Sequence, residues 1–174
     1  MKQVKKQVGK RGQVVFVING KAGTGKDTLI NFAMQYFTVR NISSVLMVKD
    51  LCMQAGWDGV YDVRGRQLLV DIKEALVKYD DLPLKFLLAE HAKFRAVEQD
   101  VMFVHIREAK EIAKFKKAVP EAKTLLIKRG EDDGCLDTSE AQIDYKYDFV
   151  IDNNVVLEKS GGELVRIIEE LRKR

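Results

Sequence analysis

The chain has 174 residues, of which 46% are hydrophobic and 32% are charged, and its formal net charge is +4. This composition is typical of a soluble globular domain that can bury a core without disulfides or metals, and it excludes a low-complexity chain. Five of the 30 basic side chains and no acidic one lie in residues 1–12, so the rest of the chain has 25 basic and 26 acidic side chains. The basic excess therefore belongs to an N-terminal tail. We expect this tail to be solvated or frayed, with a weak contact to a polyanion as the alternative.

Targeting and metal-binding signals are missing from the sequence. No segment approaches the ~18 apolar residues of a membrane helix, and no cleavage-site pattern of a signal peptide follows the basic tail. Cys52 and Cys135 stand alone, without a C-x-x-C or Cys/His cluster, so neither a zinc site nor a disulfide framework is expected. We therefore predict a reduced, cytoplasmic protein that binds no membrane and forms no stable nucleic-acid complex, as a monomer or a homodimer.

Short apolar runs alternate with longer amphipathic segments, which predicts an α/β fold with a largely parallel sheet. Three runs, VVFVI, VMFVHI and TLLIK, are almost continuously apolar, as strands covered on both faces are. We expect one domain over residues 13–174, with a short lid-like segment at about 130–146. In chain order the pattern predicts strand Gln13–Asn19, helix Lys26–Phe37, strand Ser44–Val48, helices Asp50–Ala55, Gly65–Tyr79 and Leu84–Glu98, strand Val101–Ile106, helix Ala109–Ala118, strands Thr124–Lys128 and Asp148–Ile151, and helix Gly162–Arg172.

The last of these helices has the clearest start signal. Ser160 and Glu163 have the spacing of a capping box, in which the two side chains satisfy backbone N–H groups at a helix start. Four apolar residues between Leu164 and Leu171 share one face. The pattern therefore predicts a helix that begins at Gly162 and packs on the sheet.

The stretch VVFVINGKAGTGKDTLI, residues 14–30, contains a glycine-rich loop between a predicted strand and a predicted helix. Gly20, Gly25 and Lys26 match the Walker A pattern G-x-x-x-x-G-K-[ST], in the context that this pattern requires. The glycines let successive backbone N–H groups turn inward around phosphate oxygens, and the helix adds the positive end of its dipole. The alternative is a strand–helix turn without a ligand. The expected nucleotide-binding residues are Gly20, Ala22, Gly23, Thr24, Gly25, Lys26, Asp27 and Thr28.

Asp27 occupies the position at which the Walker A pattern has Ser or Thr. A bare carboxylate would repel a polyphosphate, but with Mg²⁺ between them the interaction becomes attractive, since carboxylate oxygens are ligands for this ion. Asp27 is therefore the candidate metal ligand, directly or through a water, and Thr28 offers a hydroxyl one residue further on. ATP and Mg²⁺ are the expected cofactors.

The loop GKAGTGKDT, residues 20–28, resembles the phosphate loop of the phage-type deoxynucleoside monophosphate kinases, in the P-loop nucleotide-kinase group. Residues 101–130 resemble that family's strand, Arg, helix, strand and Arg segment. Residues 144–168 are similar to its closing strand, turn and final helix, and residues 63–72 to its Arg-rich central helix. The resemblance implies a three-layer α/β/α sandwich with a parallel five-stranded sheet in the order 2-3-1-4-5. It also implies transfer of the γ-phosphate of ATP to a (deoxy)nucleoside monophosphate.

Four arginines are candidates for contacts with phosphate, because a phosphotransferase needs cations around the moving group. Arg107 and Arg129 each follow a predicted strand, at the edge where open α/β sheets bind ligands. By resemblance, Arg107 would contact the acceptor or the transferred phosphate, and Arg129 the donor nucleotide. Arg64 and Arg66 open a helix and are candidates for an acceptor-phosphate clamp. The alternative for all four is an ordinary solvated surface arginine.

Three further residues are candidates for contact with the acceptor. Ser44 and Asp50 lie around the end of the second predicted strand, at the edge that faces the acceptor in nucleotide kinases. Asp50 would accept a hydrogen bond from the acceptor or cap the next helix. Trp57 would stack on a base or simply pack.

Two departures from the kinase pattern favour a second hypothesis, a nucleotide-binding protein without turnover. His105 stands near the end of the third predicted strand, Val101–Ile106, where a Walker B strand has an acid. It would bond phosphate, act as a base, or be an ordinary hydrogen-bonded histidine. The lid-like segment contains Lys146 but no arginine, together with six acidic residues. Either arginines at the sheet edge supply the missing charge, or turnover is slow or absent.

Overall fold

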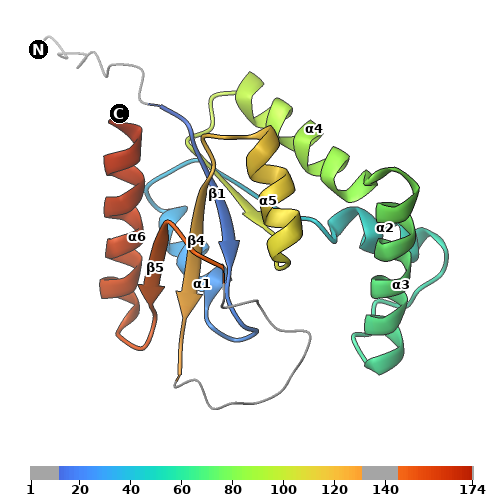
Figure 1. The fold of residues 1–174 in the computed structure, drawn as a ribbon. Helices are drawn as coiled ribbons and strands as arrows, with labels where there is room; N and C mark the ends of the chain where they lie inside the picture. The colour runs from blue at the N-terminus through green and yellow to red at the C-terminus, as the bar shows by residue number, and fades with distance from the viewer. Residues whose placement is uncertain (1–11, 131–144, 174) are drawn as a thin grey trace, which may run out of the picture.

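Five parallel strands form one sheet in a computed structural model, which describes residues 12–130 and 145–173. The order of the strands across the sheet is β2-β3-β1-β4-β5, as the resemblance implied (Figure 1). All six residues of β1 are buried, because β1 is the central strand and helices cover it on both faces. This explains why β1 is the most apolar run of the chain. The strands are β1 (Val14–Asn19), β2 (Val39–Ser43), β3 (Val101–His105), β4 (Lys123–Lys128) and β5 (Phe149–Asp152).

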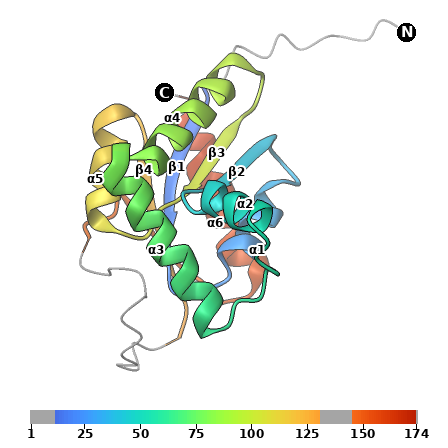
Figure 2. The ribbon, with the colours of Figure 1, turned by 90° about the vertical axis from the view of Figure 1, so that its right-hand side faces the viewer.

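Helices cover both faces of the sheet and make a three-layer α/β/α sandwich, which confirms the predicted fold class (Figures 1 and 2). Along β1, Phe16 and Ile18 point to the layer of α1 and α6, while Val15 and Val17 point to the layer of α4 and α5. The helices in the described residues are α1 (Lys26–Ala33), α2 (Leu46–Gln54), α3 (Val63–Asp80), α4 (Leu82–Ala96), α5 (Ala109–Ala118) and α6 (Leu157–Arg172).

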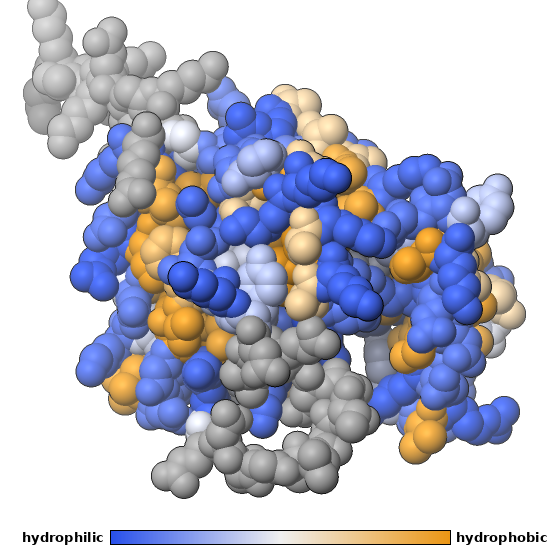
Figure 3. All heavy atoms as spheres, in the orientation of Figure 1, coloured by the Kyte–Doolittle hydropathy of each residue, from blue (hydrophilic) through white to orange (hydrophobic). Residues whose placement is uncertain are grey.

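Helices α2 and α3 form a small lobe beside the sandwich, with a core of their own. Val48, Cys52 and Leu69 are its buried residues, and Trp57 packs partly buried against them. The lobe packs on α4, and Lys73 of α3 forms ion pairs with Glu108 and Glu111 at the start of α5. Figure 3 shows a hollow between this α2–α3 lobe and the body of the molecule.

The second strand lies earlier than predicted. Residues 44–48 are not a strand: β2 is Val39–Ser43, and a helix begins at Leu46, before the predicted start at Asp50. β2 is an edge strand with only one buried residue, so it lacks the apolar run that marks the other strands. The buried residues Val48 and Cys52 are four apart, which is the spacing of one helix face.

The last helix also begins earlier than predicted, at Leu157 instead of Gly162. The predicted capping box is therefore wrong, since Ser160 lies inside α6 and is fully buried. Gly161 next to it permits close packing, because a Cβ there would lie 2.5 Å from the ring of Phe32 on α1. The other helices start or end within a few residues of their predicted limits.

The predicted tail 1–12 and most of the lid-like segment 130–146 lie outside the described residues. Of these two segments, only Gly12, Gly130, Tyr145 and Lys146 are described. In the described part of the chain, no helix is both long and apolar enough to cross a bilayer.

Candidate functional site

The glycine-rich loop joins β1 to α1 at the carboxyl edge of the sheet. Gly20, Gly23 and Gly25 have φ angles of 149°, 78° and 86°, which other residues rarely adopt. A Cβ on Gly20 would lie 2.5 Å from the carbonyl oxygen of Ile127, and one on Gly25 would lie 2.4 Å from Asn153 Nδ2. Two glycines of the Walker A pattern are therefore required by both conformation and space.

The ammonium group of Lys26 lies over the loop that precedes it. Nζ donates hydrogen bonds to the carbonyl oxygens of Gly20 at 2.6 Å and Lys21 at 2.7 Å. Thr24 closes the same turn, because its hydroxyl donates to the Lys21 carbonyl at 2.9 Å. The loop thus holds the ammonium group of Lys26 against its own carbonyl oxygens, at the start of α1.

Asp27 and Thr28 are exposed in the first turn of α1. No group of three or more His, Cys, Asp or Glu side chains among the described residues is arranged to hold a metal ion. Mg²⁺ in nucleotide sites binds one or two carboxylates and completes its shell with phosphate oxygens and water. The described residues therefore fit a Mg²⁺ ion that has Asp27 as its protein ligand and takes its other oxygens from water and a bound polyphosphate.

His105 ends β3 next to the loop. It pairs with Ile18 of β1 and Ser43 of β2, and its Nε2 lies 2.7 Å from Asn41 Oδ1. Burial lowers the pKa of His105, the charge of Asp27 opposes this effect, and the charges of Lys26 and Arg107 reinforce it. The imidazole is therefore neutral near pH 7, at the strand end where the kinase pattern has a carboxylate.

The predicted arginines Arg107 and Arg129 are both exposed at this edge, just after β3 and β4. The carbonyl of Arg107 accepts a hydrogen bond of 3.0 Å from Nδ2 of Asn19, the last residue of β1. After Arg129, Gly130 has a φ of 81°, and its N–H donates to Asn154 Oδ1 at 2.7 Å. The fold therefore brings both arginines to the edge that holds the phosphate loop.

The α2–α3 lobe carries most of the candidate acceptor residues. Arg64 and Arg66 are exposed in the first turn of α3, and Arg66 Nε donates to the Tyr61 carbonyl at 3.2 Å. Asp62 caps this helix by accepting from the Gly65 N–H at 2.7 Å. The direction of α3 at its start is therefore fixed by local hydrogen bonds, and both arginines stand on its exposed surface.

The remaining acceptor candidates have mixed outcomes. Asp50 is exposed in the middle of α2, so its predicted capping alternative is wrong. Trp57 is half-buried and packs edge-to-face on Tyr61, with 5.3 Å between the ring centroids. The structure thus shows the packing role that was one of the two expectations for this residue. Ser44 is buried, and its N–H donates to the His105 carbonyl at 3.3 Å, which joins the start of the lobe to β3.

Sequence reasoning missed Asn19, which organises the start of the loop. Its Nδ2 donates to the Arg107 carbonyl and to the Tyr147 hydroxyl, at 3.0 and 2.8 Å, and its Oδ1 accepts from the Gly20 N–H at 2.8 Å. Asn19 is 1% exposed. A single polar residue at the end of an apolar strand, directly before a glycine, is the signal that could have identified it.

Asn153 and Ser160 were also missed as parts of the site. Asn153 Nδ2 donates to the Thr24 carbonyl at 2.8 Å, and the Ser160 hydroxyl donates to Asn153 Oδ1 at 2.7 Å. Both residues are buried. No local pattern links them to the loop, because 129 positions separate Asn153 from Thr24.

Comparisons with known proteins bear on the fold. No protein-family model matches the chain, and no curated protein matches it. The protein TT1252 from Thermus thermophilus is similar in structure, with a TM-score of 0.59 and 15% sequence identity over 92% of this chain and 99% of that one. An unliganded sugar kinase from Janibacter sp. HTCC2649 has a TM-score of 0.51 and 12% identity, over 94% and 100% of the two chains. The chain therefore has a five-stranded α/β/α fold that a solved kinase shares, with a Walker A loop at the carboxyl edge of its sheet.

Proposed function

We propose that the protein is an ATP- and Mg²⁺-dependent phosphotransferase. It moves the γ-phosphate of ATP to a small nucleotide-like acceptor, a (deoxy)nucleoside monophosphate. The observation that carries this proposal is the loop between β1 and α1, which has three glycines with positive φ, together with Lys26, the first residue of α1, whose side chain folds over the loop. Such a loop binds phosphate through backbone N–H groups and a helix N-terminus.

The described residues supply the positioning and positive charge that phosphoryl transfer needs from a protein. Lys26 would contact the terminal phosphates, and Arg107 and Arg129 stand at the same sheet edge to stabilise charge on the transferring group and the donor. Mg²⁺, held beside Asp27, would neutralise charge on the phosphate oxygens. Asp27 would thus orient the donor, while the arginines would bind and orient the two phosphate-bearing ligands.

The choice of acceptor rests on the lobe and on the family resemblance. Helix α2 follows β2 directly, and Ser44 ties its start to β3, so the α2–α3 lobe flanks the carboxyl edge. The hollow in Figure 3 separates this lobe from the body. Arg64 and Arg66 are exposed on the first turn of α3 and would offer cations to a phosphate group bound beside the lobe. These features support an acceptor that itself carries a phosphate.

One observation favours a second candidate function, nucleotide binding without turnover. His105 is the polar side chain at the end of β3, and its neutral imidazole does not replace the carboxylate that kinases use beside the metal. A protein of this kind would bind ATP in the same loop and release no ADP.

Calorimetry of ATP binding, with and without Mg²⁺, tests both candidates first. We expect magnesium-dependent binding that Lys26→Ala and Asp27→Ala each weaken by about tenfold or more, while Lys117→Ala, an exposed lysine on α5, leaves it unchanged. A panel of nucleoside and deoxynucleoside monophosphates is then added, and ADP release is followed. Release with one acceptor identifies a kinase and its substrate. Binding without release for every acceptor favours the second candidate, and the absence of ATP binding contradicts both.

A further inference from the structure

Two adjacent asparagines at the junction between β5 and α6 contact two different parts of the candidate site. The N–H of Asn153 donates to the carbonyl of Lys128 at 2.7 Å, which fixes the junction to the end of β4. From there the Asn153 side chain reaches the phosphate loop, and the Asn154 side chain reaches the turn after Arg129. The proposed function assigns no role to either residue.

The amide group of Asn153 has only one orientation that fits its neighbours. The Thr24 carbonyl can only accept, so the amide nitrogen of Asn153 faces the loop and donates to it at 2.8 Å. This leaves Oδ1 to accept from the Ser160 hydroxyl at 2.7 Å. Asn153, Thr24 and Ser160 are 7%, 4% and 0% exposed, so water has little access to replace these bonds. A buried carbonyl that loses such a partner is costly.

This contact sets the direction of one peptide group in the loop. In a trans peptide the C=O and N–H groups point in opposite directions. Because Asn153 holds the Thr24 carbonyl, the N–H of Gly25 is turned away from the junction. A phosphate loop binds its ligand through backbone N–H groups. The side chain of Asn153 therefore sets the direction of one such group, the N–H of Gly25. Gly25 has no Cβ to obstruct the contact.

Asn154 has the opposite chemical role on a neighbouring segment. Its Oδ1 accepts the N–H of Gly130 at 2.7 Å, and its own N–H donates to Asp152 Oδ1 at 2.9 Å. Gly130 has a φ of 81° directly after Arg129. The bond therefore fixes the turn that follows Arg129. It requires a side chain that accepts a hydrogen bond at position 154, whereas position 153 requires a side chain that donates one.

We propose that Asn153 and Asn154 are paired positioning residues of the nucleotide site. Asn153 holds the Thr24–Gly25 peptide in the orientation that binds phosphate, and Asn154 holds the turn that carries Arg129 toward the donor nucleotide. The junction between β5 and α6 thus fixes the phosphate loop and the turn after Arg129 relative to each other. This inference rests on the proposed function, because it assumes that the loop binds a polyphosphate.

Substitutions that remove one hydrogen bond at a time separate the role of Asn153 from that of Asn154. Asn153→Asp replaces the donating nitrogen with oxygen, which cannot donate to the Thr24 carbonyl, and Ser160→Ala loosens the same amide without adding charge. Asn154→Ala removes the acceptor for Gly130, whereas Asn154→Asp keeps it. Asn31→Asp, on the exposed side of α1, is the matched control for an added negative charge.

Calorimetric titrations with ATP and with inorganic tripolyphosphate, both with Mg²⁺, provide the readout. They are made well below the unfolding temperature of every variant. Asn153→Asp is expected to weaken binding of both ligands by about tenfold or more, and Ser160→Ala to weaken both by a smaller factor. Asn154→Ala is expected to weaken binding of both ligands by several-fold, because Arg129 is a candidate phosphate contact, and Asn154→Asp to restore both affinities. Asn31→Asp is expected to match the wild type for both ligands.

The outcomes separate failure of the inference from failure of the proposed function. If the wild type binds ATP through Lys26 and Asn153→Asp binds tripolyphosphate equally well, the inference is wrong and the proposed function stands. A lower unfolding temperature with unchanged affinity would also overturn it, since Asn153 would then serve stability alone. Equal ATP affinity in Asn154→Ala overturns the second half of the pair. If the wild type binds neither ligand, the proposed function fails, and the inference with it.

Discussion

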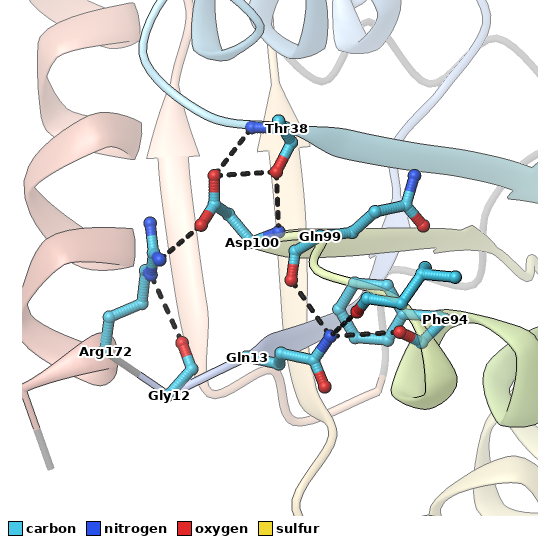
Figure 4. Close-up of polar contacts among 8 residues, drawn as sticks. Gly12, Gln13, Thr38, Phe94, Gln99, Asp100 and Arg172 are labelled. Atoms are coloured by element: carbon cyan, nitrogen blue, oxygen red, sulfur yellow. Dashed lines mark hydrogen bonds and ion pairs between the residues drawn. The ribbon is translucent and has the colours of Figure 1, made fainter. Parts of the chain in front are cut away.

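The guanidinium of Arg172, in the last turn of α6, forms an ion pair with the carboxylate of Asp100, the residue before β3 (Figure 4). The second carboxylate oxygen accepts hydrogen bonds from the N–H and hydroxyl of Thr38, at 2.7 and 2.8 Å. Burial acts to raise the pKa of Asp100, but the Thr38 bonds and the charge of Arg172 outweigh it, so the pKa lies below its ordinary value of 3.8. Asp100 therefore joins α6, β3 and the start of β2 at the edge of the sheet opposite the phosphate loop.

Asp100 should make the protein sensitive to acid. Because its pKa is lower in the folded state than in the unfolded state, its contribution to stability is complete above about pH 4 and is lost as pH falls through the folded pKa. Asp148 has the same arrangement with Thr124 and Lys116, and its pKa is also lowered. We expect Asp100→Asn to reduce the free energy of unfolding by about 1–2 kcal/mol at pH 7 and to reduce its dependence on pH below 4. Urea unfolding between pH 2.5 and 7 measures both, and an unchanged slope below pH 4 would contradict the prediction.

Gly25 and Gly23 should respond differently to the same substitution. Both have positive φ, but a Cβ on Gly25 would lie 2.4 Å from Asn153 Nδ2, whereas a Cβ on Gly23 has no atom within 4 Å. We expect Gly25→Ala to cost at least about 2 kcal/mol of stability and to abolish ATP binding, and Gly23→Ala to cost about 1 kcal/mol from backbone strain alone. Urea unfolding and ATP calorimetry on the two variants test this difference, and equal losses would mean that the contact with Asn153 is unimportant.

His105 should add no pH dependence of its own to ATP binding around neutrality. Its pKa is lowered by burial, so the imidazole stays neutral from pH 8 down to its ordinary pKa of 6.5 and gains a proton only below that value. Without Mg²⁺, the ratio of the Kd values for ATP of the wild type and His105→Gln should stay constant between pH 8 and 6.5, because the titration of the ATP phosphate affects both proteins equally. Below this range, protonation should strengthen binding in the wild type only, because a cation then stands beside the phosphates. A rise in affinity between pH 8 and 7 that His105→Gln abolishes would show that the imidazole is charged at neutral pH.

Trp57 is the single tryptophan of the chain and reports on the α2–α3 lobe alone. A Cβ on Gly65 would lie 2.0 Å from the Val60 carbonyl and 3.1 Å from Trp57 Nε1. We expect Gly65→Ala to destabilise the lobe by about 2 kcal/mol or more, and to shift the urea transition seen by tryptophan fluorescence further than that seen by circular dichroism. Gly162→Ala is the control, because a Cβ there has no atom within 4 Å. Coincident shifts by both methods would mean that the lobe unfolds together with the sandwich.

The sequence was informative where structure depends on local pattern. The apolar runs of β1, β3 and β4 and the glycine spacing of the loop are local features, and they placed the centre of the sheet and the loop between β1 and α1 correctly. The edge strand β2 could not be found in this way, since a strand with one buried residue has little apolar signal. The role of Ser160 was misread because its short-range spacing to Glu163 suggested a cap, whereas its bond to Asn153 depends on how β5 meets α6.

The contact between Asn153 and Thr24 has a consequence for the order in which the protein matures during synthesis. The loop leaves the ribosome early, but the side chains that orient its Thr24–Gly25 peptide arrive about 130 residues later. A nascent chain that ends before Ser160 can pair its central strands, yet its loop lacks the bonds that fix this peptide. Full affinity for ATP should therefore appear only after α6 has been made and has docked on α1, so ATP stabilises the earlier intermediates less than the finished fold.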